Sequence, residues 1–466
     1  MICTKCIKKL KSLISKKKED DYVFIGKGFR LDDLKQEELV DIKLLESNRV
    51  NHMFIFGAPG VGKTRLLENI IEQDIPRGHS VVIIDPKGDI DLFSKVYQMA
   101  LKTNRLDDLM FLTSIYPEYS IKINPLAHYY MVDELIDHIM AGVPAKDEFF
   151  YNVAKETTTA IVRSRMLLRK ITNKKDPLTF MEISEYCYFD GLNTLKSDVE
   201  SVNTTDPELL NEKGFILNLL EKILSSPQDY FSKVTSTLRT TLTIMTSGSI
   251  GKVIGNVKSN VFIDRLERDE PIILYVMTGS LLSRETAPIL NKVTLSMIQS
   301  SIGRVYSSGR KYKHRLNIFI DEAASAVYRG IETIPAQGRG ANVSVTFITQ
   351  SPADMIAQIG KDSARRLMDL TSTKVIMRLN EEESARIISA YGGKVKNFSY
   401  ILNTNGGVMT REVEEFAIRP EDVLRLKKRE FFYFGFEGEY KGKTARVDPT
   451  EIVIKMPNAL AVGGIR

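Results

Sequence analysis

The chain has 466 residues, of which 43% are apolar and 27% are charged, with three cysteines and no tryptophan. This length exceeds what a single hydrophobic core usually organises, so we expect two or three domains. Three cysteines exclude a disulfide framework and fit a reducing cytoplasm. The sequence also has no run close to the roughly 18 apolar residues of a transmembrane segment.

The net charge of +6 comes from the amino-terminal end. Residues 1–18 carry seven lysines and no acid, which leaves residues 19–466 at −1, so nucleic-acid binding would need local basic patches. Apolar side chains three or four residues apart predict a basic amphipathic leader over residues 1–22. Such a leader could lie on an anionic membrane or dock on a partner, and a frayed, solvated terminus is the alternative. Cys3 and Cys6 have no second ligand pair nearby, so we expect no zinc site.

The most specific motif follows an apolar run at residues 53–56. The residues GAPGVGKT, 57–64, fill the phosphate-loop template G-x-x-x-x-G-K-[ST] at every fixed position, and residues 65–73 have the apolar spacing of the helix that should follow. Glycines let backbone N–H groups converge on phosphate oxygens, the lysine adds a positive charge at the β- and γ-phosphates, and the threonine hydroxyl can ligate Mg²⁺. The sequence therefore predicts a site for ATP and Mg²⁺. Its nucleotide-binding residues are Gly57, Ala58, Pro59, Gly60, Val61, Gly62, Lys63 and Thr64.

Strand and helix patterns then alternate along the chain, which is typical of an α/β fold with a mostly parallel sheet. Buried-strand runs occupy residues 80–85, 109–113, 271–277, 315–323, 343–350 and 373–379. Amphipathic helices are predicted between several of them, for example over residues 91–101 and 287–306. Three late runs, 406–418, 429–438 and 439–448, are typical of antiparallel edge strands, with a tight hairpin at Glu437 and Gly438.

Strand patterns are absent from one long stretch in the first half of the chain. Between residues 144 and 236 only helical patterns occur, which predicts an all-α domain inserted into the α/β domain. The α/β ATPase domain would then comprise residues 23–143 and 237–456, followed by a tail over 457–466.

Three polar positions at later strands complete the predicted site. Asp321 and Glu322 end a hydrophobic strand, where the first carboxylate can hold Mg²⁺ and the second can take a proton from the attacking water; an N-cap of the next helix is the alternative. Gln350 ends the following strand and can orient the γ-phosphate and its water, unless it is an ordinary polar strand end. Arg339, between two glycines, suits an arginine finger for a neighbouring subunit, although many loop arginines are simply solvated.

Four motifs in this order, GAPGVGKT, IIDPKGD, IFIDEAAS and QGRGANVSVTFITQSPADM, resemble the DNA-pumping ATPases of the HerA/FtsK class. Most closely they resemble the type IV secretion coupling proteins of the TraD/TraG kind, over roughly residues 24–450. The resemblance implies a RecA-like P-loop domain that hydrolyses ATP. It also implies catalytic roles for Glu322, Gln350 and, in trans, Arg339, with Thr64 and Asp321 on the metal side. A homo-hexameric ring with DNA passing through its centre follows from the same resemblance.

The function implied is that of an ATP-driven DNA translocase, a coupling protein that delivers DNA or a nucleoprotein to a type IV secretion (conjugation) channel. Its partners would be single-stranded DNA, a relaxase or accessory protein at the all-α domain, and a channel or membrane subunit. Proteins of this kind usually begin with membrane-spanning helices, a place that the basic leader occupies here. We therefore expect a cytoplasmic protein, peripheral at the inner membrane and without a transmembrane segment.

Three other functions fit the phosphate loop. A HerA-like DNA-processing translocase is one, but it favours an amino-terminal β-barrel, for which the segment before residue 50 is too short. A secretion or pilus-assembly ATPase that powers protein export is another, and DNA stimulation of the ATPase would separate it from a DNA motor. A small-molecule kinase is disfavoured because no lid-like pattern is found and the helical insertion is bulky.

Overall fold

The computed structural model describes residues 22–31, 38–145, 147–402 and 408–457. The predicted leader, apart from Tyr22, and the predicted tail, apart from Pro457, lie outside the described residues. Neither prediction is tested by the fold.

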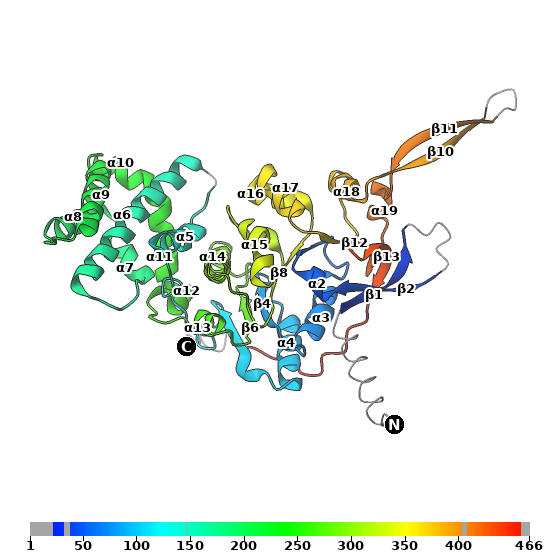
Figure 1. Ribbon diagram of the computed structural model, residues 1–466, viewed down its shortest axis with the longest axis horizontal. Helices are drawn as coiled ribbons and strands as arrows, with labels where there is room; N and C mark the ends of the chain where they lie inside the picture. Colours follow the sequence, from blue (N-terminus) through cyan, green and yellow to red (C-terminus); the bar gives the residue numbers. More distant parts are fainter. Residues whose placement is uncertain (1–21, 32–37, 146, 403–407, 458–466) are drawn as a thin grey trace, which may run out of the picture.

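A single eleven-stranded sheet organises the α/β part of the chain, with strand order β2-β1-β13-β12-β9-β3-β8-β7-β4-β6-β5 (Figure 1). Neighbouring strands from β9 to β5 run parallel, whereas β12, β13, β1 and β2 continue the sheet in antiparallel fashion. The predicted α/β fold with a mostly parallel sheet is confirmed. The strands are β1 (Tyr22–Arg30), β2 (Val40–Leu45), β3 (Met53–Phe56), β4 (Ser80–Asp85), β5 (Leu109–Thr113), β6 (Ile273–Met277), β7 (Leu316–Ile320), β8 (Val343–Thr349), β9 (Thr373–Met377), β12 (Glu430–Gly435) and β13 (Gly438–Thr444).

The late strands differ from the sequence prediction in their position. β12 and β13 do form an antiparallel hairpin, in which Gly435 pairs with Gly438, but they lie inside the sheet rather than at its edge. The edge is made by β1 and β2, which the sequence analysis did not identify. β1 approaches β13 closely, since a Cβ at Gly26 would lie 2.1 Å from the carbonyl oxygen of Lys443, so only glycine fits there.

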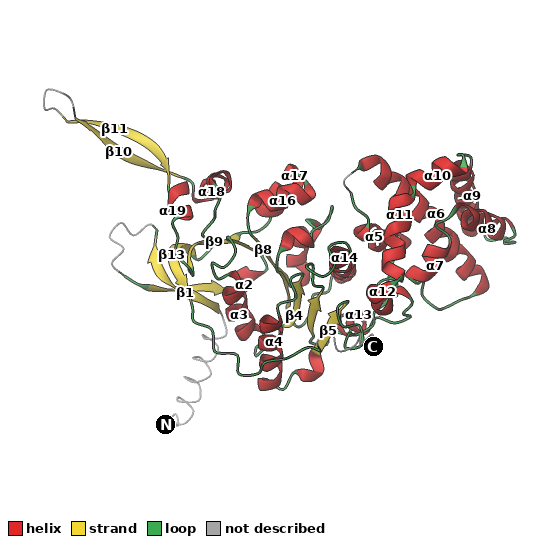
Figure 2. Cartoon of the chain, turned by 180° about the vertical axis from the view of Figure 1, so that it is seen from behind, coloured by secondary structure: helices red, strands yellow, loops and turns green. Residues whose placement is uncertain are grey.

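The first of the three late runs forms a separate structure. β11 (Val408–Phe416) pairs with β10 (Lys394–Leu402) in a two-stranded antiparallel ribbon. In both views this ribbon projects away from the sheet (Figures 1 and 2). The prediction of an antiparallel strand is confirmed here, but its partner is β10 and not the main sheet.

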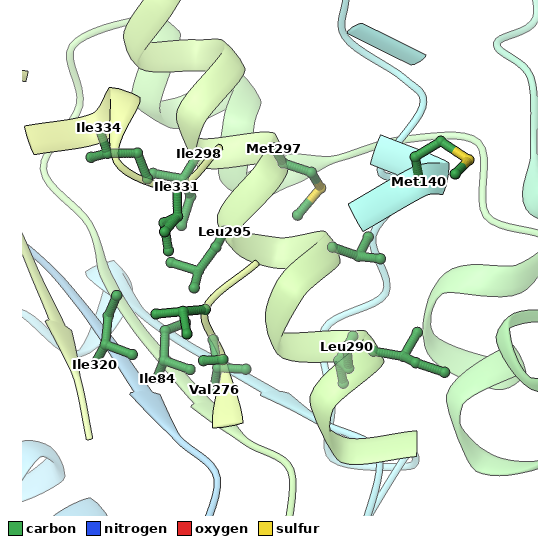
Figure 3. Packing of buried hydrophobic residues seen from close by; sticks show 14 of the residues in the cluster. Ile84, Met140, Val276, Leu290, Leu295, Met297, Ile298, Ile320, Ile331 and Ile334 are labelled. Carbon is green, nitrogen blue, oxygen red and sulfur yellow. The ribbon is translucent and has the colours of Figure 1, made fainter. Parts of the chain in front are cut away.

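Helices cover both faces of the sheet, because successive strand residues point to opposite sides and both sets are apolar. On one face Ile83 of β4 packs in a cluster with Leu66 and Ile70 of α3, and on the other Ile84 packs with the helix α14. Figure 3 shows this second layer, in which Ile84, Val276 and Ile320 of the strands face Leu295 and Ile298 of α14. The helices outside the predicted insertion are α2 (Glu46–Arg49), α3 (Lys63–Asp74), α4 (Ile90–Lys102), α5 (Val132–Gly142), α11 (Ser236–Thr246), α12 (Gly248–Ile250), α13 (Val261–Glu267), α14 (Thr286–Ser307), α15 (Thr333–Gln337), α16 (Pro352–Ile359), α17 (Lys361–Asp369), α18 (Glu382–Ser389) and α19 (Pro420–Leu424).

The stretch predicted to be all-helical contains helices and loops and no strand in its described residues, 144–145 and 147–236. Figure 2 shows these helices gathered at the end of the molecule farthest from β1 and β13. The neighbouring helix α5 contacts both α14 and α6, so the helices join the sheet layer through packing as well as through the chain. The domain boundaries themselves stay predictions. The helices are α6 (Glu148–Thr172), α7 (Phe180–Glu185), α8 (Phe189–Glu200), α9 (Pro207–Leu224) and α10 (Gln228–Val234).

Among the residues that the structure describes, no helix has both the length and the apolar character needed to cross a bilayer.

Candidate nucleotide site

The phosphate loop lies at the end of β3, between β9 and β8 and one strand in from the side of the parallel strands that borders β12. It follows β3, whose four residues are all buried, and it ends where α3 begins at Lys63. Gly60 and Gly62 have φ angles of 76° and 115°, which glycine adopts without steric cost. The Ala58 N–H donates to the carbonyl of Arg378, at the end of β9, over 2.8 Å. The loop is therefore held by the neighbouring strand in the context that the motif requires.

The side chain of Lys63 turns back onto this loop. It is 7% exposed, and its Nζ donates to the carbonyl oxygens of Gly57 and, over 3.0 Å, of Ala58. Burial lowers the pKa of Lys63, and the nearby charge of Lys87 lowers it further. A Cβ at Gly60 would meet no atom within 4 Å, so the loop faces open space at this position. Thr64, half-buried in the first turn of α3, completes the loop.

The predicted acidic pair follows β7 directly. The Asp321 N–H donates to the carbonyl of Ile84 over 2.9 Å, which extends the pairing of β7 with β4, and Asp321 is 1% exposed. Burial raises the pKa of Asp321 despite the opposing effect of the Lys87 ammonium. Glu322 has a φ of 49°, a left-handed conformation that is strained for a residue with a side chain.

The alternative role for the acidic pair, that of a helix cap, holds only in part, since Glu322 occupies the N-cap position of the helix that follows. A short 3₁₀ helix, Ala323–Ser325, does begin after Glu322, but the Glu322 side chain makes no capping hydrogen bond to it. Its Oε1 instead accepts a hydrogen bond of 3.2 Å from Nε2 of Gln350, which follows β8. Two of the predicted site residues are therefore in direct contact.

A residue that the sequence analysis did not assign to the site joins them. Lys87 follows β4, and its Nζ lies 3.0 Å from Oε2 of Glu322 and 3.4 Å from Oδ2 of Asp321. Burial alone would lower the pKa of Lys87, but the two carboxylates outweigh it and the pKa is raised. One sequence signal could have identified Lys87. Two strand patterns end in an acid, at Asp85 and at Asp321, and parallel neighbouring strands bring their carboxyl ends, with the residues that follow, close together.

The turn that carries Lys87 is fixed by Asp85, the last residue of β4. One carboxylate oxygen of Asp85 accepts the N–H groups of Lys87 and Gly88 at 3.0 and 3.1 Å, and the other accepts that of Asp89 at 2.6 Å. The Tyr275 hydroxyl donates to the same carboxylate over 2.8 Å. Burial raises the pKa of Asp85 even with these donors around it.

Arg339 lies elsewhere. It is exposed, in the 3₁₀ helix Gly338–Ala341 that precedes β8, whereas Gln350 follows β8. The seven residues of β8 separate the two by roughly 20 Å at about 3.3 Å per residue. The structure therefore brings together Lys63, Asp321, Glu322 and Gln350 at the carboxyl edge of the sheet but leaves Arg339 at the opposite edge of the same chain.

Comparison with known proteins places this arrangement in a family. Residues 5–434 match the model of the type IV secretory system conjugative DNA transfer proteins. The type 4 coupling protein DotL of Legionella pneumophila is 24% identical over 451 residues, which cover 85% of this chain and 54% of DotL. The chain thus spans about half the length of this curated relative.

Solved structures share the fold. The bacterial conjugative coupling protein TrwB, in a form named TrwBdeltaN70, superposes with a TM-score of 0.64 at 17% identity, over 88% of this chain and 90% of that chain. TrwB in complex with ADP and Mg²⁺ gives 0.63 at 16% identity, over 88% and 90%. VirB4 of Thermoanaerobacter pseudethanolicus gives 0.52 at 15% identity, over 91% and 96%. These similarities confirm the RecA-like P-loop fold, and the family match confirms the resemblance to coupling proteins: the chain belongs to the type IV secretory system conjugative DNA transfer family.

Proposed function

We propose that this chain is an ATP-hydrolysing motor, a coupling protein that moves DNA or a nucleoprotein into a type IV secretion channel. The observation that supports hydrolysis most directly is the meeting of three strand ends beside the phosphate loop. There Lys87 follows β4, Asp321 and Glu322 follow β7, and Gln350 follows β8. A site that only bound nucleotide would not need a carboxylate held ready by an amide and an ammonium.

The loop from Gly57 to Thr64 would bind the phosphates of ATP. Its backbone N–H groups and the Lys63 ammonium supply donors, and the Lys63 contacts to Gly57 and Ala58 would exchange for phosphate oxygens. The Thr64 hydroxyl and the Asp321 carboxylate are hard oxygen ligands of the kind that Mg²⁺ prefers. When bound, Mg²⁺ would neutralise charge on the phosphate oxygens. The TrwB complex with ADP and Mg²⁺ supports this assignment by analogy of fold.

Glu322 would act as general base toward the attacking water. Its Oε2 is buried beside the Lys87 ammonium, 3.0 Å away, and is the oxygen that would take the water proton. The hydrogen bond from Gln350 to Oε1 fixes the orientation of the carboxylate. Gln350 would thereby couple the water-activating group to the end of β8.

Arg339 would complete the site of a neighbouring subunit. Since it is exposed and lies at the far end of β8 from its own phosphate loop, it would reach a γ-phosphate only in trans. This placement supports a homo-hexamer as the active form. The helices of residues 144–236 would bind a relaxase or accessory protein, and a membrane or channel subunit would recruit the assembly to the inner membrane.

The test is the ATPase activity of the purified chain, with and without single-stranded DNA, over a series of protein concentrations. We expect DNA-stimulated turnover whose specific activity rises with concentration, and at least a hundredfold loss in Lys63→Ala. An ATPase rate that does not change when DNA is added would favour a protein-export ATPase instead. A Lys63→Ala variant that hydrolyses ATP normally would contradict the nucleotide site itself.

A further inference from the structure

Asp321 and Glu322 both form ion pairs with Lys87, and a bound nucleotide would bring further negative charge to these residues. Lys87 Nζ lies 3.0 Å from Glu322 and 3.4 Å from Asp321, so its single positive charge is shared between two carboxylates. The neighbouring Lys63 ammonium is directed to loop carbonyls instead. Arrival of a γ-phosphate beside two carboxylates would add negative charge to an acidic edge. A cation that can move to the phosphate would relieve that repulsion.

Lys87 has the mobility that such a transfer needs. Its side chain is 43% exposed, in contrast to the nearly buried Asp321, and its four-carbon stem can turn without any change in the backbone. The backbone beneath it is rigid, because Asp85 accepts the N–H groups of Lys87, Gly88 and Asp89. A fixed base with a movable ammonium can therefore switch between two partners over a short path.

The ion pair between Lys87 and Glu322 can also be broken without loss of the orientation of Glu322. The 3.0 Å approach is an ion pair in which Oε2 receives no aligned hydrogen bond, whereas Oε1 is hydrogen-bonded by Gln350. Removal of Lys87 would leave the carboxylate in place, still oriented by Gln350, and would free Oε2 on the side where a water can approach. Withdrawal of the ammonium would leave Oε2 open to a hydrogen bond from that water.

We propose that Lys87 distinguishes the triphosphate from the diphosphate: its ammonium pairs with Glu322 and Asp321 until ATP binds, and then turns to the γ-phosphate and leaves Glu322 free to face the attacking water. Lys87 is thus a positioning and specificity-determining residue of the proposed ATPase, and the inference rests on that proposed function. It requires no bond-forming step by Lys87 itself, since the proton of the water still goes to Glu322.

The experiment compares the affinities of ADP and of a non-hydrolysable ATP analogue, each with Mg²⁺, by calorimetry. Lys87→Met keeps the apolar stem and removes the charge. We expect it to weaken the ATP analogue roughly 10- to 100-fold, the range of a lost charge-assisted contact, and to change ADP affinity less than about threefold. We expect Lys87→Arg, which keeps the charge, to restore most of the preference, and KM for ATP to rise in Lys87→Met by a larger factor than kcat changes.

Lys102→Met is the matched control. Lys102 at the end of α4 makes a comparable half-exposed ion pair, 3.4 Å from Glu451, and its loss should alter neither affinity. An equal loss of ADP and ATP-analogue affinity in Lys87→Met would mean that Lys87 only neutralises the acids, and an unchanged ratio would likewise overturn the inference. Failure of the proposed function would give a different result. The wild-type chain would then bind neither nucleotide, or its affinities for both nucleotides would equal those of Lys63→Ala.

Discussion

The two edges of the parallel strands carry the same kinds of charged residue in opposite states. At the carboxyl edge, the half-exposed ammonium of Lys87 pairs with both Asp321 and Glu322. At the amino edge, Arg49 is 3% exposed and donates twice to Asp74, with a distance of 2.7 Å to Oδ2. One edge is open to exchange of partners, and the other is closed.

The closed edge holds a buried ion network that pairs its carboxylates with guanidinium groups. Asp74 also accepts a hydrogen bond of 3.0 Å from Asn317, and Glu46 contacts both Arg49 and Arg315. Glu46, Asp74 and His79 present ligand atoms within 4.8 Å of one another, the spacing of a metal site. Since two guanidinium groups already balance these carboxylates, the cluster is better explained as a structural ion network. Proximity of acids alone does not mark a functional site.

The largest loss of ATP turnover should come from substitution of Arg339, which lies far from the carboxyl edge of its own chain. We expect Arg339→Ala to lower ATP turnover about 10³-fold or more, the range known for arginine fingers, while ATP still binds. Mixing Arg339→Ala with Glu322→Gln should partly restore turnover, because the first subunit keeps the base and the second supplies the arginine. Steady-state ATPase assays of the mixture measure this.

Arg310→Ala, an exposed arginine on another loop, is the control for that measurement and should leave turnover unchanged. No recovery in mixtures that demonstrably contain both subunits in one assembly would place the action of Arg339 within its own chain, against the separation that β8 imposes.

The next largest effect tests the open edge directly. Glu322→Gln keeps the size of the side chain and removes the proton acceptor, so kcat should fall about 10²- to 10³-fold with nucleotide affinity retained. Single-turnover hydrolysis and nucleotide binding measured on the same preparation separate the two effects. Glu332→Gln, the same change at a half-buried glutamate directly before α15, should hydrolyse ATP normally. Normal turnover in Glu322→Gln would remove this residue from the mechanism.

The closed edge should respond through stability instead. Asp74→Asn leaves the buried Arg49 guanidinium with an incomplete counter-charge, which costs about 3 kcal/mol of unfolding free energy. Urea unfolding measures this loss, and the folded variant should keep its affinity for ATP within about twofold. Asp41→Asn is the contrast, since its exposed pairs with Lys27 and Lys43, both 3.7 Å, are worth less than about 1 kcal/mol. A change in kcat with unaltered stability would erase the distinction between the edges.

The sequence reveals the open edge better than the closed one, because its motifs are local. GAPGVGKT and the strand ending in Asp321 and Glu322 are each contiguous, so the strand context could be predicted from apolar runs. Lys87 was missed as a site residue although its motif was recognised. Its partners lie 234 and 235 positions away, and only the pairing of β4 with β7 brings them together. Strand order is a property of the whole fold that no local pattern contains.

The same limit explains the strands that the sequence analysis did not identify. β1 and β2 have mixed patterns with exposed positions, and β1 finds its partner at the other end of the chain, where Gly26 pairs with Thr444. β12 and β13, which the sequence analysis assigned to the edge, therefore lie inside the sheet. The amino-edge network was equally hidden, since Arg49 and Asp74 look like ordinary surface residues until folding buries them.

The smallest effect expected is a pH dependence of stability from His52, which precedes β3 at the closed edge. Its Nδ1 accepts the N–H of Val345 over 3.1 Å, and burial lowers its pKa to about 4 from 6.5. The unfolded chain therefore binds more protons between pH 6.5 and 4. Stability is complete above pH 6.5, falls as the pH drops through this window, and is lower by about 2 kcal/mol at pH 5.

His52→Asn is the variant that isolates this contribution. Asparagine tolerates the φ of 62° found at this position, and its side-chain oxygen can accept the same N–H, but it does not titrate. Urea unfolding of both proteins at pH 8 and pH 5 should show the wild type losing about 2 kcal/mol more than the variant, since all other titrating groups cancel in the difference. Equal losses of unfolding free energy in the two proteins would mean that His52 is protonated in the folded chain, which its acceptor role toward Val345 forbids. ATP turnover at neutral pH should be the same in both proteins, because no residue at the carboxyl edge is altered.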